Sequence, residues 1–383
     1  MFNSIFLKNG LEISLTPFFL KWEMYMEDSE INDLRNDTNF NGVSFSKFKK
    51  TDVKKELLNS LIHSKIEPAC YWSAELICAG HYDCLWEIIL LFFSKFVHLG
   101  NLNIGIYIEM RLNNFKTILH NGYTDSSLAL RNNDKIRQLF CEIMCVLCDA
   151  KRRHSFDNVK IKMEDLNMIT IKDKFKAPST EYGEEVFTTE DPKELFPFIN
   201  ELSYSVTATG NNQMIACYWI EWIFEYDSRC KALKEKILCE RRNFAKVESK
   251  CQKDIIWIIW DIFLKESLKR NKLIQKIINT LLNLFCLKYT TNCHKKRKNL
   301  MYLAISVLCE TFTLEKEIIR HSHIDLVTNI KLNINTVYIQ IKKNEESTKT
   351  DYLFTGMKSR NLENTIKKLD QMNSFGESFI PRV

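Results

Sequence analysis

The chain has 383 residues, of which 45% are hydrophobic and 12% aromatic, and this composition excludes a disordered chain because it supplies enough apolar surface for a core. Its 54 basic and 48 acidic side chains nearly cancel, leaving a formal net charge of +6, which permits a polyanionic partner without requiring one. The length exceeds that of one small domain and predicts two.

Glycine and proline are scarce, at 10 and 6 residues, and because the tight turns of β-sheets consume both, we predict an all-α fold. The 13 cysteines indicate reduced thiols in an intracellular protein, cytoplasmic or nuclear. We expect no secretory leader, since Lys8 and Glu12 interrupt the apolar start. We also expect no membrane span, since the best candidate, at 84–99, is short and holds Glu87 and Lys95.

The first part of the chain is predicted to be an arm followed by helices. Residues 1–50 form an N-terminal arm that packs on the core. Residues 51–154 form a first helical half, because their apolar side chains recur at intervals of three and four residues. Within this half, Gly80 is placed to end one helix and Asp83 to cap the next.

The middle of the chain breaks this pattern. Residues 155–192 are polar and predict a linker or a small hairpin insertion, since 159–163 and 169–172 alternate between apolar and polar residues. Helical spacing resumes over 193–343, which we predict to be the second helical half. Residues 344–383 are predicted to form a polar tail.

A repeated tetrapeptide relates the two halves. Ala-Cys-Tyr-Trp occurs at residues 69–72 and again at 216–219, and the apolar run at 86–90 has a counterpart at 260–264. Repetition of this kind indicates an internal duplication. We therefore predict two related helical halves with a polar insertion between them.

Two interpretations of the repeated aromatic residues are open. Ala69 and Trp72, like Ala216 and Trp219, are three residues apart and so fall on one helix face, as the residues of a repeat core would. Alternatively, the exposed rings would form a platform for stacking bases or another ligand. The spacing favours core packing.

Three clusters have metal-ligand spacing, and the most distinctive of them is formed by cysteines alone. Cys141, Cys145 and Cys148 match the spacing of the iron–sulfur motif in the radical S-adenosylmethionine enzymes, although Leu147 replaces the aromatic residue usual before the third cysteine. With His154 as a fourth ligand, the same residues would instead suit zinc. The run is also an apolar helix, on which the thiols would be core residues. We therefore predict no cofactor and keep the metal site as an alternative.

Basic runs suggest a second kind of site. Lys295, Lys296, Arg297 and Lys298 form the densest run, and Arg152 and Arg153 form another. Such runs contact phosphate backbones or act as nuclear-import signals, and the alternative is a solvated loop between helices.

Short catalytic motifs are missing from the sequence. It contains no G-x-x-x-x-G-K-[ST] loop, no G-x-G-x-x-G, no H-E-x-x-H and no G-x-S-x-G, and its carboxylates are scattered. This lowers the expectation of an enzyme but does not exclude one.

One segment resembles a known family. Within residues 67–101, the residues that carry the resemblance are Ala69, Tyr71, Trp72, Ala74, Gly80, Leu90 and Phe93. With them, this segment is similar to the helical region behind the ATPase module in clamp-loader-related AAA+ proteins of the Werner-helicase-interacting type. The resemblance implies a collar through which subunits oligomerise. It does not imply ATP hydrolysis, because the phosphate-binding loop is missing.

The chain as a whole, rich in Lys, Asn and Cys, also resembles uncharacterised helical proteins of large nucleocytoplasmic DNA viruses. We expect a non-enzymatic helical scaffold or assembly protein that acts through protein–protein contacts, with a protein partner or self-association. The first alternative is a nucleic-acid-associated replication or transcription accessory factor. The second is a metalloprotein that uses Cys141, Cys145 and Cys148.

Overall fold

The computed structural model describes residues 4–6, 12–14, 29–123, 127–156, 159–166, 168–235, 237–291, 293–315 and 317–346. Helices dominate this part of the chain, which confirms the all-α prediction. The strands in it are β1 (Ser4–Phe6) and β2 (Glu12–Ser14), a short antiparallel pair. The rest of the predicted arm up to residue 28, and the predicted tail from residue 347, lie outside the described residues.

Five helices form what we call the first half. α2 (Ile66–Cys78) packs on α1 (Lys50–Ile62) and α5 (Asp134–Asp149), and α1 also contacts α3 (Tyr82–Phe92). Gly80, with φ +73°, follows the second helix and lets the chain turn sharply, as predicted, whereas Asp83 lies in the first turn of the third helix instead of capping it. The remaining helix of this half is α4 (Asn103–His120).

The insertion at 155–192 holds short helical turns, including α6 (Met168–Ile171) and α7 (Glu181–Glu184), so the predicted hairpin is wrong for its described residues. The reason is local hydrogen bonding. The Asp165 carboxylate accepts the backbone N–H of Lys162 at 3.1 Å, which closes a turn. The Asp165 carbonyl accepts the indole N–H of Trp222 at 2.8 Å, so these polar groups find partners without a neighbouring strand.

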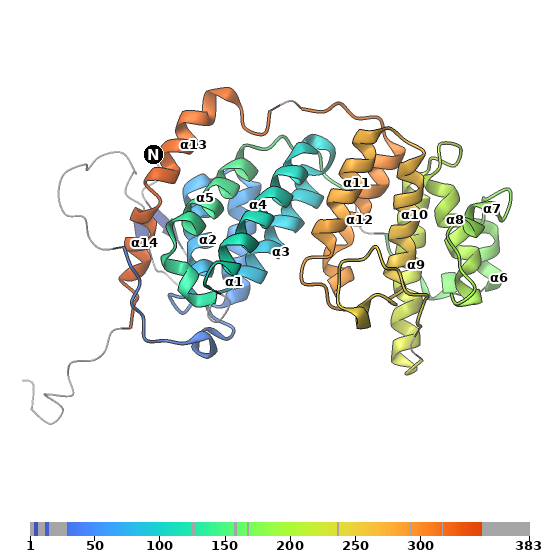
Figure 1. The fold of residues 1–383 in the computed structure, drawn as a ribbon, viewed down its shortest axis with the longest axis horizontal. Helices are drawn as coiled ribbons and strands as arrows, with labels where there is room; N and C mark the ends of the chain where they lie inside the picture. The colour runs from blue at the N-terminus through green and yellow to red at the C-terminus, as the bar shows by residue number, and fades with distance from the viewer. Residues whose placement is uncertain are drawn as a thin grey trace, which may run out of the picture.

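Five further helices form the second half. α8 (Phe196–Val206) packs on α9 (Gln213–Ala232) and α10 (Ile256–Leu268). α12 (Cys293–Cys309) packs on α9 and α11 (Lys272–Phe285) (Figure 1). Asn212 and Asn271 cap two of them, each accepting the N–H three residues on.

The last two helices, α13 (Ile324–Leu332) and α14 (Asn335–Lys342), return to the first half. Figure 1 shows the chain crossing above the molecule after α12 and descending at the far side. α13 packs on α5, and α14 packs on α2. The sequence assigned both helices to the second half, through residue 343, but their contacts tie them to the first.

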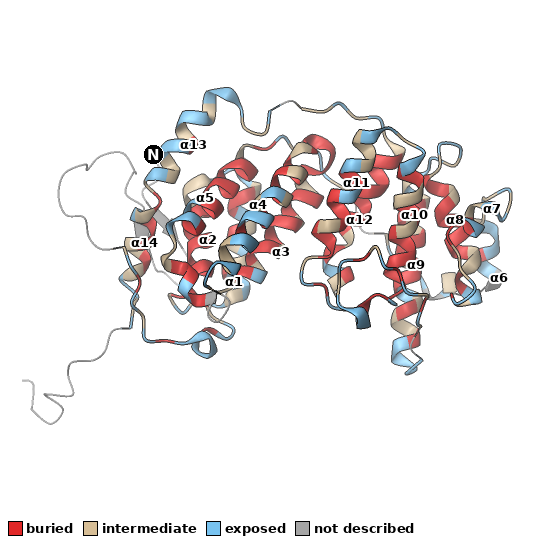
Figure 2. Ribbon diagram, viewed as in Figure 1, coloured by how far each residue is buried: buried red, intermediate tan, exposed pale blue. Residues whose placement is uncertain are grey.

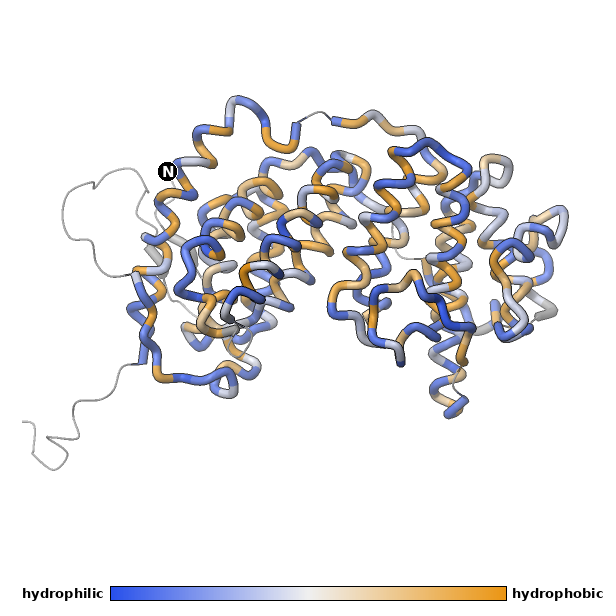
Figure 3. Tube along the Cα trace, viewed as in Figure 1, coloured by the Kyte–Doolittle hydropathy of each residue, from blue (hydrophilic) through white to orange (hydrophobic). Residues whose placement is uncertain are grey.

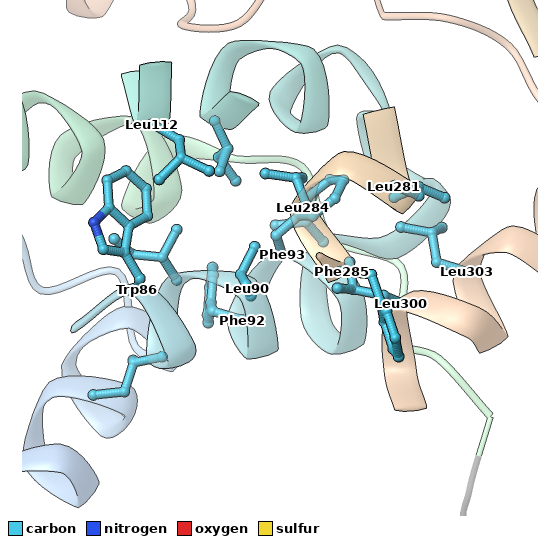
Figure 4. Packing of buried hydrophobic residues seen from close by; sticks show 14 of the residues in the cluster. Trp86, Leu90, Phe92, Phe93, Leu112, Leu281, Leu284, Phe285, Leu300 and Leu303 are labelled. Atoms are coloured by element: carbon cyan, nitrogen blue, oxygen red, sulfur yellow. The ribbon is translucent and has the colours of Figure 1, made fainter. Parts of the chain in front are cut away.

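The two halves meet through an apolar interface between α3 and α4 on one side and α11 and α12 on the other. Figure 4 shows these side chains facing one another, and the buried apolar residues of the halves belong to one continuous cluster. Figures 2 and 3 show the same arrangement, with buried, hydrophobic residues lining the facing helices, whereas α13 is largely exposed or half-buried. The labelled contributors are Trp86, Leu90, Phe92, Phe93, Leu112, Leu281, Leu284, Phe285, Leu300 and Leu303.

Among the described residues, no helix has both the length and the hydropathy needed to cross a membrane.

Candidate functional site

A hollow lies at the junction of the two halves, where α1 and α3 meet the start of α12. It has a volume of about 500 Å³, and most of its lining surface is apolar. Trp86, Ile88, Leu91 and Leu287 supply apolar lining, while Lys54 and Lys296 supply positive charge from opposite halves. It is large enough for several side chains of a bound segment.

A second hollow, of about 320 Å³, continues from the first. The two share four lining residues, Asp83, Trp86, Leu287 and Lys288, and the second adds Lys116 and Lys246. We call the two hollows together the inter-half groove. Its linings combine apolar residues with lysines contributed by both halves.

The acidic residues of the groove are already engaged within the chain. Asp83 pairs with Lys288 at 2.7 Å, and Glu87 pairs with Arg297. Glu109 accepts hydrogen bonds from Thr280 at 2.7 Å and Asn283 at 2.6 Å, both on α11. Each of these contacts joins the first half to the second.

Four lysines of the groove have no such neutralising partner. Within the described residues, Lys54, Lys116, Lys246 and Lys296 make no ion pair, and the last three are exposed. Because the carboxylates are paired and these lysines are not, the groove presents a net positive charge to a ligand.

The predicted basic run at 295–298 divides between surface and core. Lys295 and Lys296 are exposed, whereas Arg297 is only 5% exposed and donates to the carbonyls of Phe285 at 2.7 Å and Leu287 at 2.6 Å. Arg297 thereby caps the end of α11. Lys298 pairs with Glu221 of α9 at 2.6 Å. Of this run, only Lys295 and Lys296 are therefore available to an external ligand.

Arg152 and Arg153, the other predicted basic pair, also serve the fold. Arg152 donates to the carbonyl of Leu61 at 2.8 Å and to the hydroxyl of Ser64 at 2.6 Å. Arg153 pairs with Glu310, at the end of α12. Both residues line a different hollow from the inter-half groove, so the structure does not bring the two basic runs into one site.

A buried thiol cluster lies between α2 and α5. The sulfur atoms of Cys70, Cys141 and Cys145 all lie within 4.8 Å of one another, and those of Cys70 and Cys141 are 3.9 Å apart. Their exposed fractions are 2%, 1% and 0%. Hydrogen bonds from the Cys141 and Cys70 thiols lower the pKa of Cys145 to about 5, since they favour its thiolate form.

This cluster differs from the predicted set of Cys141, Cys145, Cys148 and His154. Cys148 lines a surface hollow with Asp149 instead, and the ring of His154 packs against Phe96 at 5.2 Å. Sequence spacing could not find Cys70, because it comes from another helix. The available signal was its place in the repeated tetrapeptide.

The repeated tryptophans are buried, and each packs against its tyrosine in the same way, although Tyr71 is buried and Tyr218 only partly so. Trp72 and Trp219 are 2% and 0% exposed, which makes them core residues and not a stacking platform. Each lies edge-on to the preceding tyrosine, with ring centres 5.1 Å apart and interplanar angles of 82° and 78°. Ala69 and Ala216, one turn earlier on the same faces, are fully buried.

Each tryptophan also packs against a phenylalanine from the segment that precedes its half. Phe48, just before α1, lies 5.7 Å from Trp72, and Phe175, in the insertion before α8, lies 5.6 Å from Trp219. Both tryptophans thus have an aromatic neighbour outside their own helix.

Comparison of the chain with models of protein families, with curated proteins and with solved structures finds no match.

Proposed function

We propose that this chain is a non-enzymatic helical scaffold protein that acts through protein–protein contacts, and that the inter-half groove holds an acidic, amphipathic helix of a protein partner. The observation that carries the proposal is the groove itself, with apolar residues in its lining and four unpaired lysines around it. Grooves of this kind bind the apolar face of a helix, while opposite charges at the rim set orientation and specificity.

An internal duplication explains why a groove exists at this place. The contacts of α1 with α2 and α3, and of α2 with α5, have counterparts in those of α8 with α9 and α10, and of α9 with α12. The tetrapeptides lie in the second helix of each set, α2 and α9. The matching clusters around Trp72 and Trp219 support the same relationship. Two packed copies of one helical unit leave a seam between them, and the groove follows that seam.

The chemistry of the groove favours binding over catalysis. Its described carboxylates make contacts within the chain, as shown by the pairs of Asp83 with Lys288 and Glu87 with Arg297. A general acid or base needs a titratable group directed at a substrate, and groups held in structural pairs do not meet that need. The groove instead offers shape, apolar area and positive charge.

The first experiment is a fluorescence-anisotropy titration with a synthetic helix that carries leucines on one face and glutamates on the other. We expect saturable binding that weakens by about tenfold or more, equivalent to about 1.4 kcal/mol, when Lys54→Glu and Lys296→Glu are combined. Lys272→Glu with Lys276→Glu is the matched control, because both lysines are exposed on α11 outside the groove lining. Unchanged binding in the groove variant contradicts the proposal.

A nucleic-acid-associated accessory factor is the second candidate, because the same unpaired lysines would also attract phosphates. A labelled single-stranded oligonucleotide in the same titration distinguishes the two. If the oligonucleotide binds in a salt-dependent manner, the groove variant weakens it and the acidic helix does not bind, the second candidate replaces the first. Arg297 is left intact in this test, since its contacts are structural.

A further inference from the structure

We propose that Cys70, Cys141 and Cys145 form a three-coordinate site for a soft monovalent metal ion, Cu(I). The site goes beyond the groove and does not depend on the function proposed for it. The three thiols converge from α2 and α5 in the core of the first half, and no other group of three metal-ligating side chains is found among the described residues.

The separation of the sulfur atoms fits one ion. Metal–sulfur bonds of about 2.3 Å arranged in a trigonal plane place the sulfurs about 4 Å apart. Cys70 and Cys141 have a sulfur separation of 3.9 Å, and the whole set lies within 4.8 Å. An ion at the centre therefore requires shifts of only a fraction of an ångström, which side-chain rotation can supply.

The donor set selects the class of ion. Thiolates prefer soft ions such as Cu(I), or zinc and iron–sulfur clusters. Structural zinc sites are almost always four-coordinate, and no fourth cysteine, histidine or carboxylate reaches this cluster in the part of the chain that the structure describes. Since all three cysteines are at most 2% exposed, solvent water does not reach the site as the fourth ligand of a tetrahedral ion.

A nearby cation reduces the cost of the negative charge of the bound site. Glu142, next to Cys141 in the chain, is contacted by both Arg111 and Lys331, so two positive groups meet one carboxylate. Lys331 also favours the thiolate forms of Cys141 and Cys145, which lowers part of the cost of burying three thiolates around one Cu(I). Each thiol that ligates the ion gives its proton to solvent, and copper enters and remains as Cu(I), so no oxidant or reductant is consumed.

The C-terminal helices provide a route to the cluster. α13 and α14 pack on α5 and α2, the two helices that carry the thiols. α13 buries only Val327 and is tied to α5 by the Lys331–Glu142 pair, so opening this route breaks that pair but exposes little apolar area. α14 is held by the Arg137 guanidinium, 4.1 Å from the Tyr338 ring centre.

The test is an anaerobic titration of reduced protein with Cu(I) in competition with bicinchoninate. We expect one tightly bound ion per chain, and an affinity lower by at least about 100-fold in the Cys70→Ala and Cys145→Ala variants, because losing a ligand costs more than losing an outer-shell partner. Cys217→Ala is the matched control, because Cys217 occupies the same place in the second tetrapeptide and is equally buried but belongs to no thiol cluster. Equal affinity in the Cys70 and Cys217 variants would overturn the proposal.

X-ray absorption spectroscopy at the copper edge tests the site on the wild-type protein, and so does not depend on whether a variant folds. The wild-type protein loaded with one equivalent of Cu(I) should show three sulfur neighbours at about 2.3 Å. Two neighbours only, or nitrogen or oxygen neighbours, would contradict a site formed by Cys70, Cys141 and Cys145.

Discussion

At the scale of single residues, a run of charges divides according to the helix that carries it. Residues 295–298 are consecutive and basic, yet Lys295 and Lys296 face solvent while Arg297 is buried. Successive residues on a helix point about 100° apart, so part of any such run must face the core. The sequence predicts the charge but not which member is inside, because that depends on Glu87 and the end of α11.

Arg297→Ala tests this division. The change leaves Glu87 without its partner and two carbonyls of the α11 end without a donor, so we expect a loss of about 3 kcal/mol in the free energy of unfolding. Lys295→Ala and Lys296→Ala should each change it by less than about 0.5 kcal/mol, since both side chains are exposed. Urea unfolding curves provide the comparison, and similar losses in all three variants would contradict the structural role.

At the scale of elements, the helices that carry the tetrapeptides were predictable because periodicity of three and four is a strong signal over long segments. The turns of the insertion were not predictable, since they are set by contacts such as that of Asp165 with Trp222, which lie 57 residues apart.

His98 is another residue whose surroundings depend on a contact distant in sequence. It follows a π-helical turn, Phe93–Val97, and its Nδ1–H donates to the Ser94 carbonyl at 2.9 Å. Its Nε2 then accepts from the Ser306 hydroxyl at 3.0 Å, which joins the first half to α12.

The pH dependence of stability follows from the burial of His98. Burial lowers the pKa of His98 to about 4, with Arg153 adding to the effect, whereas an unfolded histidine titrates near 6.5. Between these values the unfolded chain binds a proton that the folded chain does not, so the free energy of unfolding falls as pH drops from about 6.5 to 4. The contribution of this one group is about 3 kcal/mol across that window.

His98→Asn isolates this term. The variant should lose less stability than the wild type between pH 7 and pH 4.5, by about 2.5 kcal/mol, because the titrating ring is gone while the carboxylates are unchanged. Urea unfolding of both proteins at the two pH values measures the difference. Parallel losses would show that His98 is not the group responsible.

At the scale of the whole molecule, the inter-half groove results from how two helical units pack. The sequence indicated two related halves and basic residues near 295, but it gave no means of placing Lys54, Lys116 and Lys246 beside them. Those lysines come from distant segments, and only the packing of α3 and α4 against α11 and α12 brings them together. For the same reason, the sequence could not place Cys70 beside the thiols of α5.

The most direct test of the groove as the partner-binding surface is hydrogen exchange of the full chain with and without the acidic amphipathic helix. The account predicts that exchange slows in α3 and in the segment from Leu287 to the first turns of α12, which line the groove, and stays unchanged in α7 and α8. Protection at α7 and α8, or no protection at saturating peptide, would contradict it.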